Sequence, residues 1–173
     1  MSHGADDPKL RAPVPANPPR VVLVEPEIPQ NTGNIARLCA ATQCPLHLVG
    51  PLGFSIDEKA VRRAGLDYWP LVDLHRHVSL AQLRHEHPDA RWLLFSGRSS
   101  RSYLDAAYRP GDALLFGRES VGLPPELLGE HEERVFAIPT MGAVRSLNLA
   151  HAVGIVVYEA LRQLGMLTPT FLG

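Results

Sequence analysis

The chain has 173 residues, of which 45% are hydrophobic and 20% are charged, and its net charge is −1. These proportions are ordinary for one globular domain with a sizeable core. The sequence holds no apolar run of the ~20 residues that a membrane helix needs, and no apolar leader, so we expect a cytoplasmic protein. The net charge excludes a globally basic surface, and any nucleic-acid-binding patch must be local.

The first nineteen residues are rich in proline and contain little that could form a core. This composition predicts a disordered or extended tail over residues 1–19. A single folded domain is then expected over residues 20–173.

Short apolar runs alternate with segments of helical periodicity from Arg20 onward. We predict strands over residues 21–24, 46–49, 92–95, 113–116 and 135–138. We predict helices over residues 31–43, 57–64, 79–86 and 147–164, and a short one opened by Pro124 and Pro125. This alternation indicates an α/β fold, with a mostly parallel sheet and helices on both faces.

Three of the predicted strands run into loops of glycine, proline and small polar residues, at 96–98, 117–119 and 139–142. Ligands of open α/β sheets usually bind beyond the carboxyl ends of the strands. The pattern therefore predicts a ligand pocket built largely from the backbone of these loops.

The last predicted helix is small or apolar on nearly every side between Leu149 and Val157. A helix that is apolar all round is buried on all sides. Since a domain of this size has little room to enclose its terminal helix, we predict a homodimer that covers the outer face. The alternative is that the helix lies centrally within one chain.

Cysteine and histidine patterns favour structural interpretations. Cys39 and Cys44 have neither a redox nor a zinc spacing, so both are predicted to be small core residues. Four histidines form two His-x-His pairs, at His75, His77, His85 and His87. They lack cysteine or carboxylate partners in a recognised spacing, so we interpret them as surface residues of a helix and its entry loop and expect no metal.

Three segments could carry chemistry. The first, from Glu25 to Arg37, leads from a strand through a proline-stiffened loop into a helix that Asn31 could cap. Gly33 would permit close backbone approach, and Arg37 would lie on the same side as Asn31 or Asn34. The alternative is a helix cap followed by a surface arginine.

The second segment, Gly117 to Pro124, places Glu119 between two glycines directly after an apolar strand, although the bare pattern is also that of a turn. In the third segment, Ser146 or Asn148 could cap the last helix or face a ligand with its side chain and backbone amide.

Together the three segments resemble the three motifs of the SPOUT methyltransferases, in the branch that methylates ribose 2′-hydroxyls of RNA, over residues 20–165. The strings at 25–35, 62–68 and 156–160 are most similar to the bacterial subfamily that modifies cytidine or uridine 34, the wobble nucleotide of tRNA. Two features depart from the subfamily pattern: Arg118 stands where proline is common, and residues 140–145 are one residue shorter than usual.

The resemblance replaces an ordinary open sheet, which the residues alone would favour, with a deep C-terminal trefoil knot. It implies S-adenosylmethionine as cofactor without a metal, the anticodon region of tRNA as partner, and a homodimer. Two alternatives stay open: 2′-O-methylation of another tRNA position or of rRNA, and a non-catalytic RNA-binding module on the same fold.

The resemblance also assigns residue roles. Arg37 would be the central catalytic residue, either as a base or as an electrostatic stabiliser, because a guanidinium is effectively always protonated. Asn31, Glu119 and Asn148 would orient the substrate or the loops. Four residues would line the cofactor site: Phe95, Gly117, Ile138 and Ser146.

Bound RNA would be held by local arginines. Five are candidates for phosphate contact: Arg62, Arg63, Arg98, Arg101 and Arg145. For any one of them, an ordinary solvated surface position is the alternative.

Overall fold

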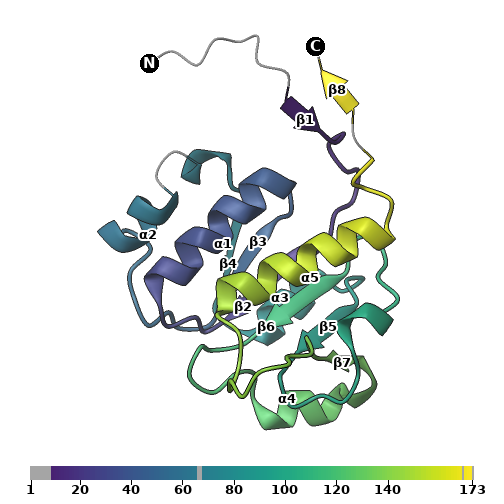
Figure 1. Ribbon diagram of the computed structural model, residues 1–173. Helices are drawn as coiled ribbons and strands as arrows, with labels where there is room; N and C mark the ends of the chain where they lie inside the picture. Colours follow the sequence, from purple (N-terminus) through teal and green to yellow (C-terminus); the bar gives the residue numbers. More distant parts are fainter. Residues whose placement is uncertain (1–8, 66–67, 169, 173) are drawn as a thin grey trace.

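A six-stranded parallel sheet forms the centre of the protein. The computed structural model describes residues 9–65, 68–168 and 170–172. The strands lie in the order β4-β3-β2-β6-β5-β7 (Figure 1). Their bounds are β2 Arg20–Val24, β3 Leu46–Val49, β4 Leu74–His77, β5 Trp92–Phe95, β6 Ala113–Phe116 and β7 Val135–Phe136.

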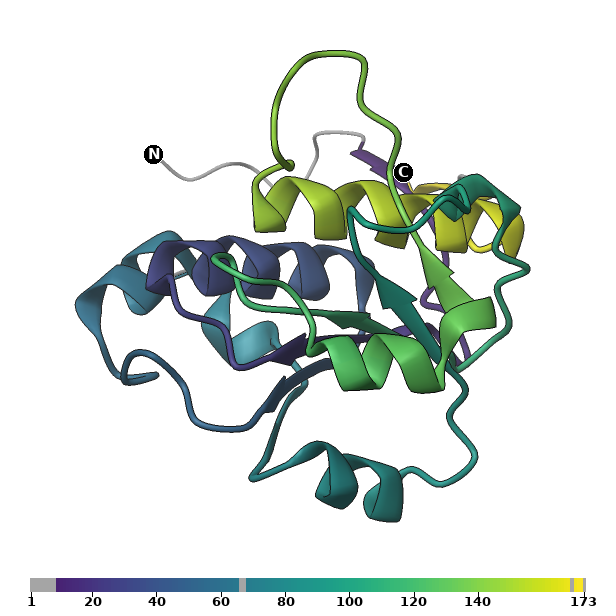
Figure 2. The same cartoon turned by 90° about the horizontal axis from the view of Figure 1, so that it is seen from below.

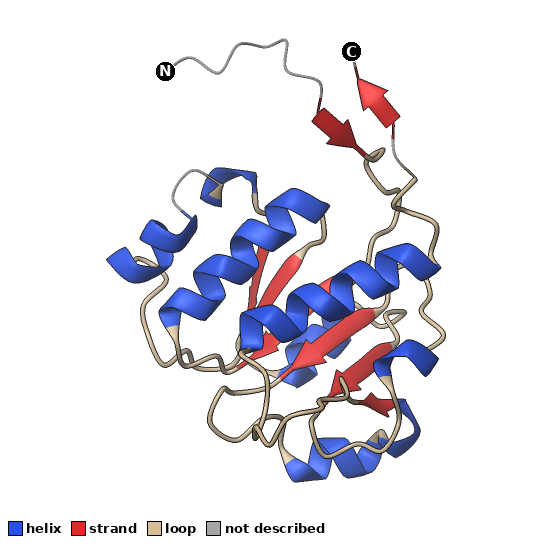
Figure 3. Cartoon of the chain, viewed as in Figure 1, coloured by secondary structure: helices blue, strands red, loops and turns tan. Residues whose placement is uncertain are grey.

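Helices cover both faces of this sheet, as predicted (Figures 2 and 3). On one face α1 (Pro29–Thr42) lies beside α5 (Leu149–Gln163), and α2 (Lys59–Gly65) packs against α1. On the other face lie α3 (Leu80–Glu86) and α4 (Pro125–Glu130). Short 3-10 turns occur at Trp69–Leu71, Tyr103–Asp105 and Glu132–Arg134.

Alternate strand residues enter two separate cores. Leu23 of β2 packs with Ile35 and Val157 under α1 and α5, whereas its neighbour Val22 packs with Leu83 on the opposite face. Side chains of a strand point alternately to the two faces of a sheet, so a continuous apolar run is required here. This explains why the five apolar strands were predictable. Cys39 and Cys44 are buried and free in the first core, as predicted.

The prediction missed β4, and its interpretation of His77 as a surface residue was wrong, whereas His85 is exposed on α3, as predicted. The strand reads Leu-His-Arg-His, which carries no apolar run, yet His77 is only 5% exposed because α3 covers that face. His77 is therefore not a surface residue of an entry loop. The predicted strand at 135–138 is also too long, because β7 ends at Phe136 and Ala137 forms only an isolated bridge to Ser102.

Two short strands near the ends of the chain pair with each other. Strand β1 (Lys9–Arg11) lies antiparallel to β8 (Thr170–Leu172), so part of the predicted tail forms a two-stranded ribbon. Residues 1–8 of that tail lie outside the described residues. The division into a tail and one domain, and the C-terminal knot, stay predictions.

Helix α5 buries one side and exposes the other. Val153, Val156 and Val157 are fully buried, whereas Ile155 is 39% and Tyr158 is 47% exposed. The exposed side excludes the alternative in which the helix is enclosed within one chain. Among the described helices, none combines the length and apolarity needed to cross a membrane.

Candidate active site

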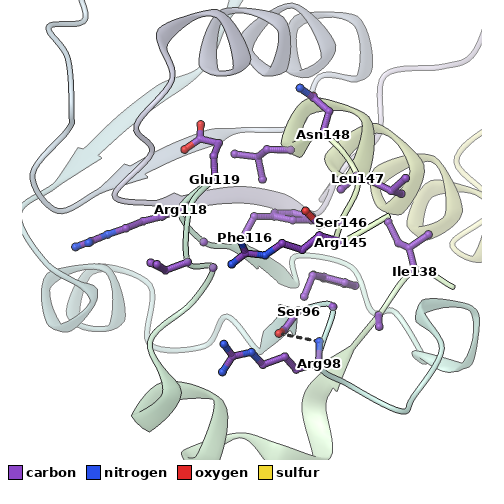
Figure 4. A pocket seen from close by; sticks show the side chains of 18 of the residues that line it. Ser96, Arg98, Phe116, Arg118, Glu119, Ile138, Arg145, Ser146, Leu147 and Asn148 are labelled. Atoms are coloured by element: carbon purple, nitrogen blue, oxygen red, sulfur yellow. Dashed lines mark hydrogen bonds between the residues drawn. The ribbon is translucent and has the colours of Figure 1, made fainter. Parts of the chain in front are cut away.

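A cavity of about 600 Å³ opens where the carboxyl ends of β5, β6 and β7 meet the start of α5 (Figure 4). Each of the three loops predicted to form a pocket contributes to its wall, through residues 96–98, residues 117–119 and Thr140. Seven of the eight residues proposed for catalysis or cofactor binding line it: Asn31, Phe95, Gly117, Glu119, Ile138, Ser146 and Asn148. The sequence-based prediction of a pocket at this edge is therefore confirmed, although the individual roles stay proposals.

A chain of hydrogen bonds joins the three motif segments. The Glu119 carboxylate accepts from the backbone amides of Glu27 (2.8 Å) and Ile28 (3.1 Å), and from the side-chain amide of Asn31 at 3.4 Å. Asn148 Nδ2 in turn donates to Asn31 Oδ1 at 3.1 Å. Residues far apart in sequence are thus held in one network, which we call the Glu119–Asn31–Asn148 network.

Only one of the predicted helix caps is present. Helix α1 begins at Pro29 after Ile28, and Asn31 lies within its first turn with 6% exposure, so it is not a cap. Asn148 does cap α5, because its side-chain oxygen accepts from the amides of Ala150 (2.9 Å) and His151 (3.4 Å). Both Asn148 roles operate together, since its nitrogen binds Asn31 while its oxygen caps the helix.

The loop after β6 is fixed by a close backbone approach at Gly117. A Cβ at this position would lie 2.1 Å from the carbonyl carbon of Gly122, so any residue other than glycine would clash with the backbone there. Gly33 permits close backbone approach, as expected, and the element that approaches it is helix α2. A Cβ there would come within 2.5 Å of the Ala64 Cβ, so Gly33 permits close packing of α1 on α2.

Two more carboxylates hold this loop, and the prediction did not single them out. Glu27 accepts from the backbone amide (3.1 Å) and the hydroxyl (2.8 Å) of Ser120. Glu25 pairs with Arg118 at 2.7 Å, at a partly exposed position. Arg118, the departure from the subfamily pattern, therefore ties the β6 loop to the end of β2. Both glutamates lie within the first motif segment, and this position is the feature of the sequence that could have indicated their role.

Arg37 is the exception among the proposed site residues. Its side chain is exposed, and its guanidinium carbon lies 4.7 Å from the ring centroid of Tyr68, a cation–π arrangement. It shares the exposed side of α1 with Asn34 rather than the buried side with Asn31. The cavity lining does not include Arg37, so the structure does not bring it to the pocket of its own chain.

The candidate RNA-binding arginines divide into two groups. Arg98 and Arg145 line the cavity, and Figure 4 shows their guanidinium groups on the same side of it. Arg63 and Arg101 are exposed away from the lining, and Arg101 donates to the carbonyl of Glu132. The side chain of Arg62 lies outside the described residues.

Comparison with known proteins identifies the family. Residues 18–158 match the SpoU rRNA Methylase family. The chain belongs to this SpoU methylase family. A relative from Acidovorax sp. (strain JS42), a tRNA (cytidine(34)-2'-O)-methyltransferase, is 48% identical over 152 residues, which cover 86% of this chain and 94% of the relative.

Solved structures extend the likeness of this SpoU methylase to the fold. A structure described as giving insight into the 2-OH methylation of C/U34 on tRNA is 51% identical, with a TM-score of 0.82 over 86% of this chain and 97% of that one. An AdoMet-bound rRNA methyltransferase from Sinorhizobium meliloti is 28% identical, with a TM-score of 0.76 over 85% of this chain and 57% of that one.

Proposed function

We propose that this SpoU methylase transfers a methyl group from S-adenosylmethionine to the ribose 2′-hydroxyl of nucleotide 34, cytidine or uridine, of tRNA. The observation that carries the proposal is the Glu119–Asn31–Asn148 network, which assembles the three motif segments around one cavity. Relatives named for this activity match nearly the whole chain at about half identity, including the segments that build the network.

The cavity fits S-adenosylmethionine. Its volume lies within the range of small-molecule sites. Phe95, Ile138 and Leu149 offer apolar surface for an adenine ring, and loop backbone with the Ser146 hydroxyl offers polar groups at the edge. When bound, the cofactor supplies a methyl group already activated by a positive sulfur, so this reaction requires no metal.

The network residues position the site, and Arg37 acts on the substrate. Asn31, Glu119 and Asn148 satisfy one another, so they hold the motif loops in place at the cavity wall. A guanidinium stays protonated in proteins, so it does not serve as a general base. We assign Arg37 to contact with the substrate phosphate and to stabilisation of the developing alkoxide.

We propose further that the protein is a homodimer through α5. Helices α1 and α5 lie side by side (Figure 1), and both have an exposed side, with Arg37 on α1 and with Ile155 and Tyr158 on α5; we infer that these exposed sides form one surface. A second copy packed on this surface would cover the apolar side chains and place Arg37 next to a partner's cavity. This arrangement reconciles a catalytic Arg37 with its absence from its own pocket.

Arg98 and Arg145 at the cavity are the proposed phosphate contacts for tRNA, and the substrate implies a cytoplasmic site of action. If both contact phosphate, lowering the salt concentration strengthens tRNA binding, and replacing either arginine reduces the slope of affinity against salt by roughly one. A salt-independent affinity contradicts this assignment.

The decisive experiment is methyl transfer from labelled S-adenosylmethionine to unmodified tRNA, with the modified nucleotide mapped. Label at nucleotide 34 is expected, and a matched tRNA carrying a 2′-deoxyribose only at nucleotide 34 should accept none. Label that persists in this control indicates another tRNA position. Label found only in rRNA indicates the rRNA alternative, and binding of tRNA without any transfer indicates a non-catalytic module.

A further inference from the structure

A cluster of four histidines lies on the face of the sheet that α3 covers, outside the lining of the cavity. His47 comes from β3, His75 and His77 from the neighbouring strand β4, and His87 follows the end of α3. The ring of His47 stacks on those of His75 (4.5 Å between centroids) and His77 (5.1 Å), and meets His87 edge-on at 5.0 Å.

Two members of this cluster are buried without the partners that buried imidazoles usually have. His47 is fully buried and His77 is 5% exposed. His47 Nδ1 and His77 Nε2 lie 2.8 Å apart, but within the described part of the chain the buried Nε2 of His47 has no hydrogen-bond partner. Buried polar atoms are almost always satisfied, so this nitrogen shows that the described chain leaves the hydrogen bonding of the cluster incomplete.

Glu86 orients this cluster. Its Oε2 lies 2.9 Å from Nδ1 of His77, although the contact lacks the alignment of a hydrogen bond. A carboxylate beside Nδ1 favours the proton on that nitrogen and leaves Nε2 as an electron-pair donor. Metal-binding histidines commonly have a carboxylate beside the ring nitrogen that does not bind the metal.

We propose that His47, His77 and His87 bind a divalent transition metal ion of the zinc type. Each offers one ring nitrogen, and the three nitrogens lie within 4.8 Å of one another. Zn–N bonds of about 2.0–2.1 Å in a tetrahedron separate the nitrogens by about 3.3 Å, so the His47–His77 pair needs to open by roughly half an ångström. Water or His75 would complete the tetrahedron.

The chemistry of the cluster selects the type of metal. Imidazole nitrogens favour zinc, nickel, cobalt or copper over magnesium and calcium, which prefer oxygen. A histidine binds such a metal through a ring nitrogen that carries no proton. Two nearby charges have opposite effects on the binding of a cation. The Glu86 carboxylate favours it, whereas the Arg20 guanidinium, which donates a hydrogen bond to the carbonyl of Gly111, disfavours it.

The site would be structural rather than catalytic. It would join β3, the edge strand β4 and the end of α3 at one point. Helix α3 has seven residues, and Leu83 is its only residue described as buried, so apolar packing holds it weakly. A metal at His87 would fix this helix to the edge of the sheet.

The test is zinc binding by the untagged full-length chain after chelator treatment, measured by calorimetry, with Co²⁺ absorption as a spectroscopic check. One equivalent per chain is expected for the wild type. His87→Ala should abolish this binding, since His87 is only half-buried and its removal leaves the core intact. His85→Ala, an exposed histidine on the same helix outside the cluster, is the matched control and should bind like the wild type.

Glu86→Gln provides a second, milder variant. It retains all three ligands but removes the carboxylate beside His77, so zinc affinity should fall about 10- to 100-fold. The proposal is overturned if the folded wild type binds no stoichiometric zinc or cobalt, or if His87→Ala binds as tightly as His85→Ala. None of these readouts depends on methyl transfer, so this proposal stands or fails independently of the proposed function.

Discussion

The cavity edge of the sheet and the outer surface of α1 and α5 differ in whether their side chains find partners within one chain. At the cavity, Glu119, Asn31 and Asn148 satisfy one another, and the surrounding loops are tied down by Glu25 and Glu27. On the outer surface, Arg37 stacks on Tyr68 in solvent, and apolar side chains of α5 are uncovered.

This difference indicates a division of labour. One chain holds the walls of the proposed cofactor pocket in place through its own contacts, as the geometry of a small-molecule site requires. The group proposed to act on the substrate lies on a surface that only a second chain would bring to a pocket. The two regions should therefore respond differently to substitution, and the following variants test that separation.

The largest effect is expected for Arg37→Ala. Removal of the proposed alkoxide-stabilising group should slow methyl transfer roughly 10²- to 10³-fold, while S-adenosylhomocysteine binding measured by calorimetry stays unchanged because Arg37 lies outside the cavity. Arg76→Ala, an exposed arginine on the edge strand β4, is the matched control. Unchanged turnover of Arg37→Ala removes this residue from the mechanism.

The next variant, Gly117→Ala, is designed to perturb the cavity and not the outer surface. The added Cβ would overlap the backbone at Gly122, so the loop must move and S-adenosylhomocysteine should bind about tenfold or more weakly. The strain should also lower the free energy of unfolding by about 1–3 kcal/mol. Gly129→Ala is the control, because a Cβ there meets nothing within 4 Å. Equal cofactor binding by both variants contradicts the inferred loop geometry.

These two variants together test whether sites are shared between chains. A mixed dimer of Arg37→Ala and Gly117→Ala subunits would hold one site with an intact pocket from the first and an intact arginine from the second. Mixing after subunit exchange should then restore about a quarter of wild-type activity, by random pairing in a twofold dimer. No recovery despite demonstrated exchange indicates that each site uses its own arginine.

The contrast also explains which features the sequence could predict. The apolar runs at Val21–Val24 and Ala113–Phe116 are short, and each can be recognised as a strand from its own sequence. The loops that follow these strands meet at one edge because the strands of the sheet are parallel. The motif residues of the pocket could be predicted because each motif lies within one short stretch of sequence. The contacts between motifs could not be predicted, since a contact such as that of Glu27 with Ser120 joins residues 93 positions apart.

The histidine cluster shows the opposite case. His47 stands alone within the apolar strand Leu46–Val49 and gives no signal in sequence, whereas His75 and His77 suggest a polar loop. Only the register of β3 against β4, which places His47 beside His75, brings them together. A site assembled from three elements by strand pairing has no local spacing from which it could be recognised.

Substitution of Ile155 tests the outer surface directly. Ile155→Glu places a charge within the exposed apolar part of α5, so the dimer should dissociate at least about tenfold more readily, or about 1.4 kcal/mol, as measured by sedimentation. Cofactor binding should persist, because Ile155 does not line the cavity. Val78→Glu, at an exposed valine beside α3, is the control and should not alter the oligomeric state. A wild-type monomer contradicts the dimer outright.

The smallest effect is expected for Asn148→Ser, which separates the two roles of that residue. Serine can still cap α5, but it lacks the amide that donates to Asn31, so stability should change by less than about 1 kcal/mol. Methyl transfer should fall severalfold, because Asn31 and Glu119 lose one fixed neighbour at the cavity wall. Asn148→Ala, which removes both roles, should show the same loss of activity and an additional fall in melting temperature. If Asn148→Ser matches the wild type in activity, the bond to Asn31 contributes nothing to the site, and capping accounts for Asn148.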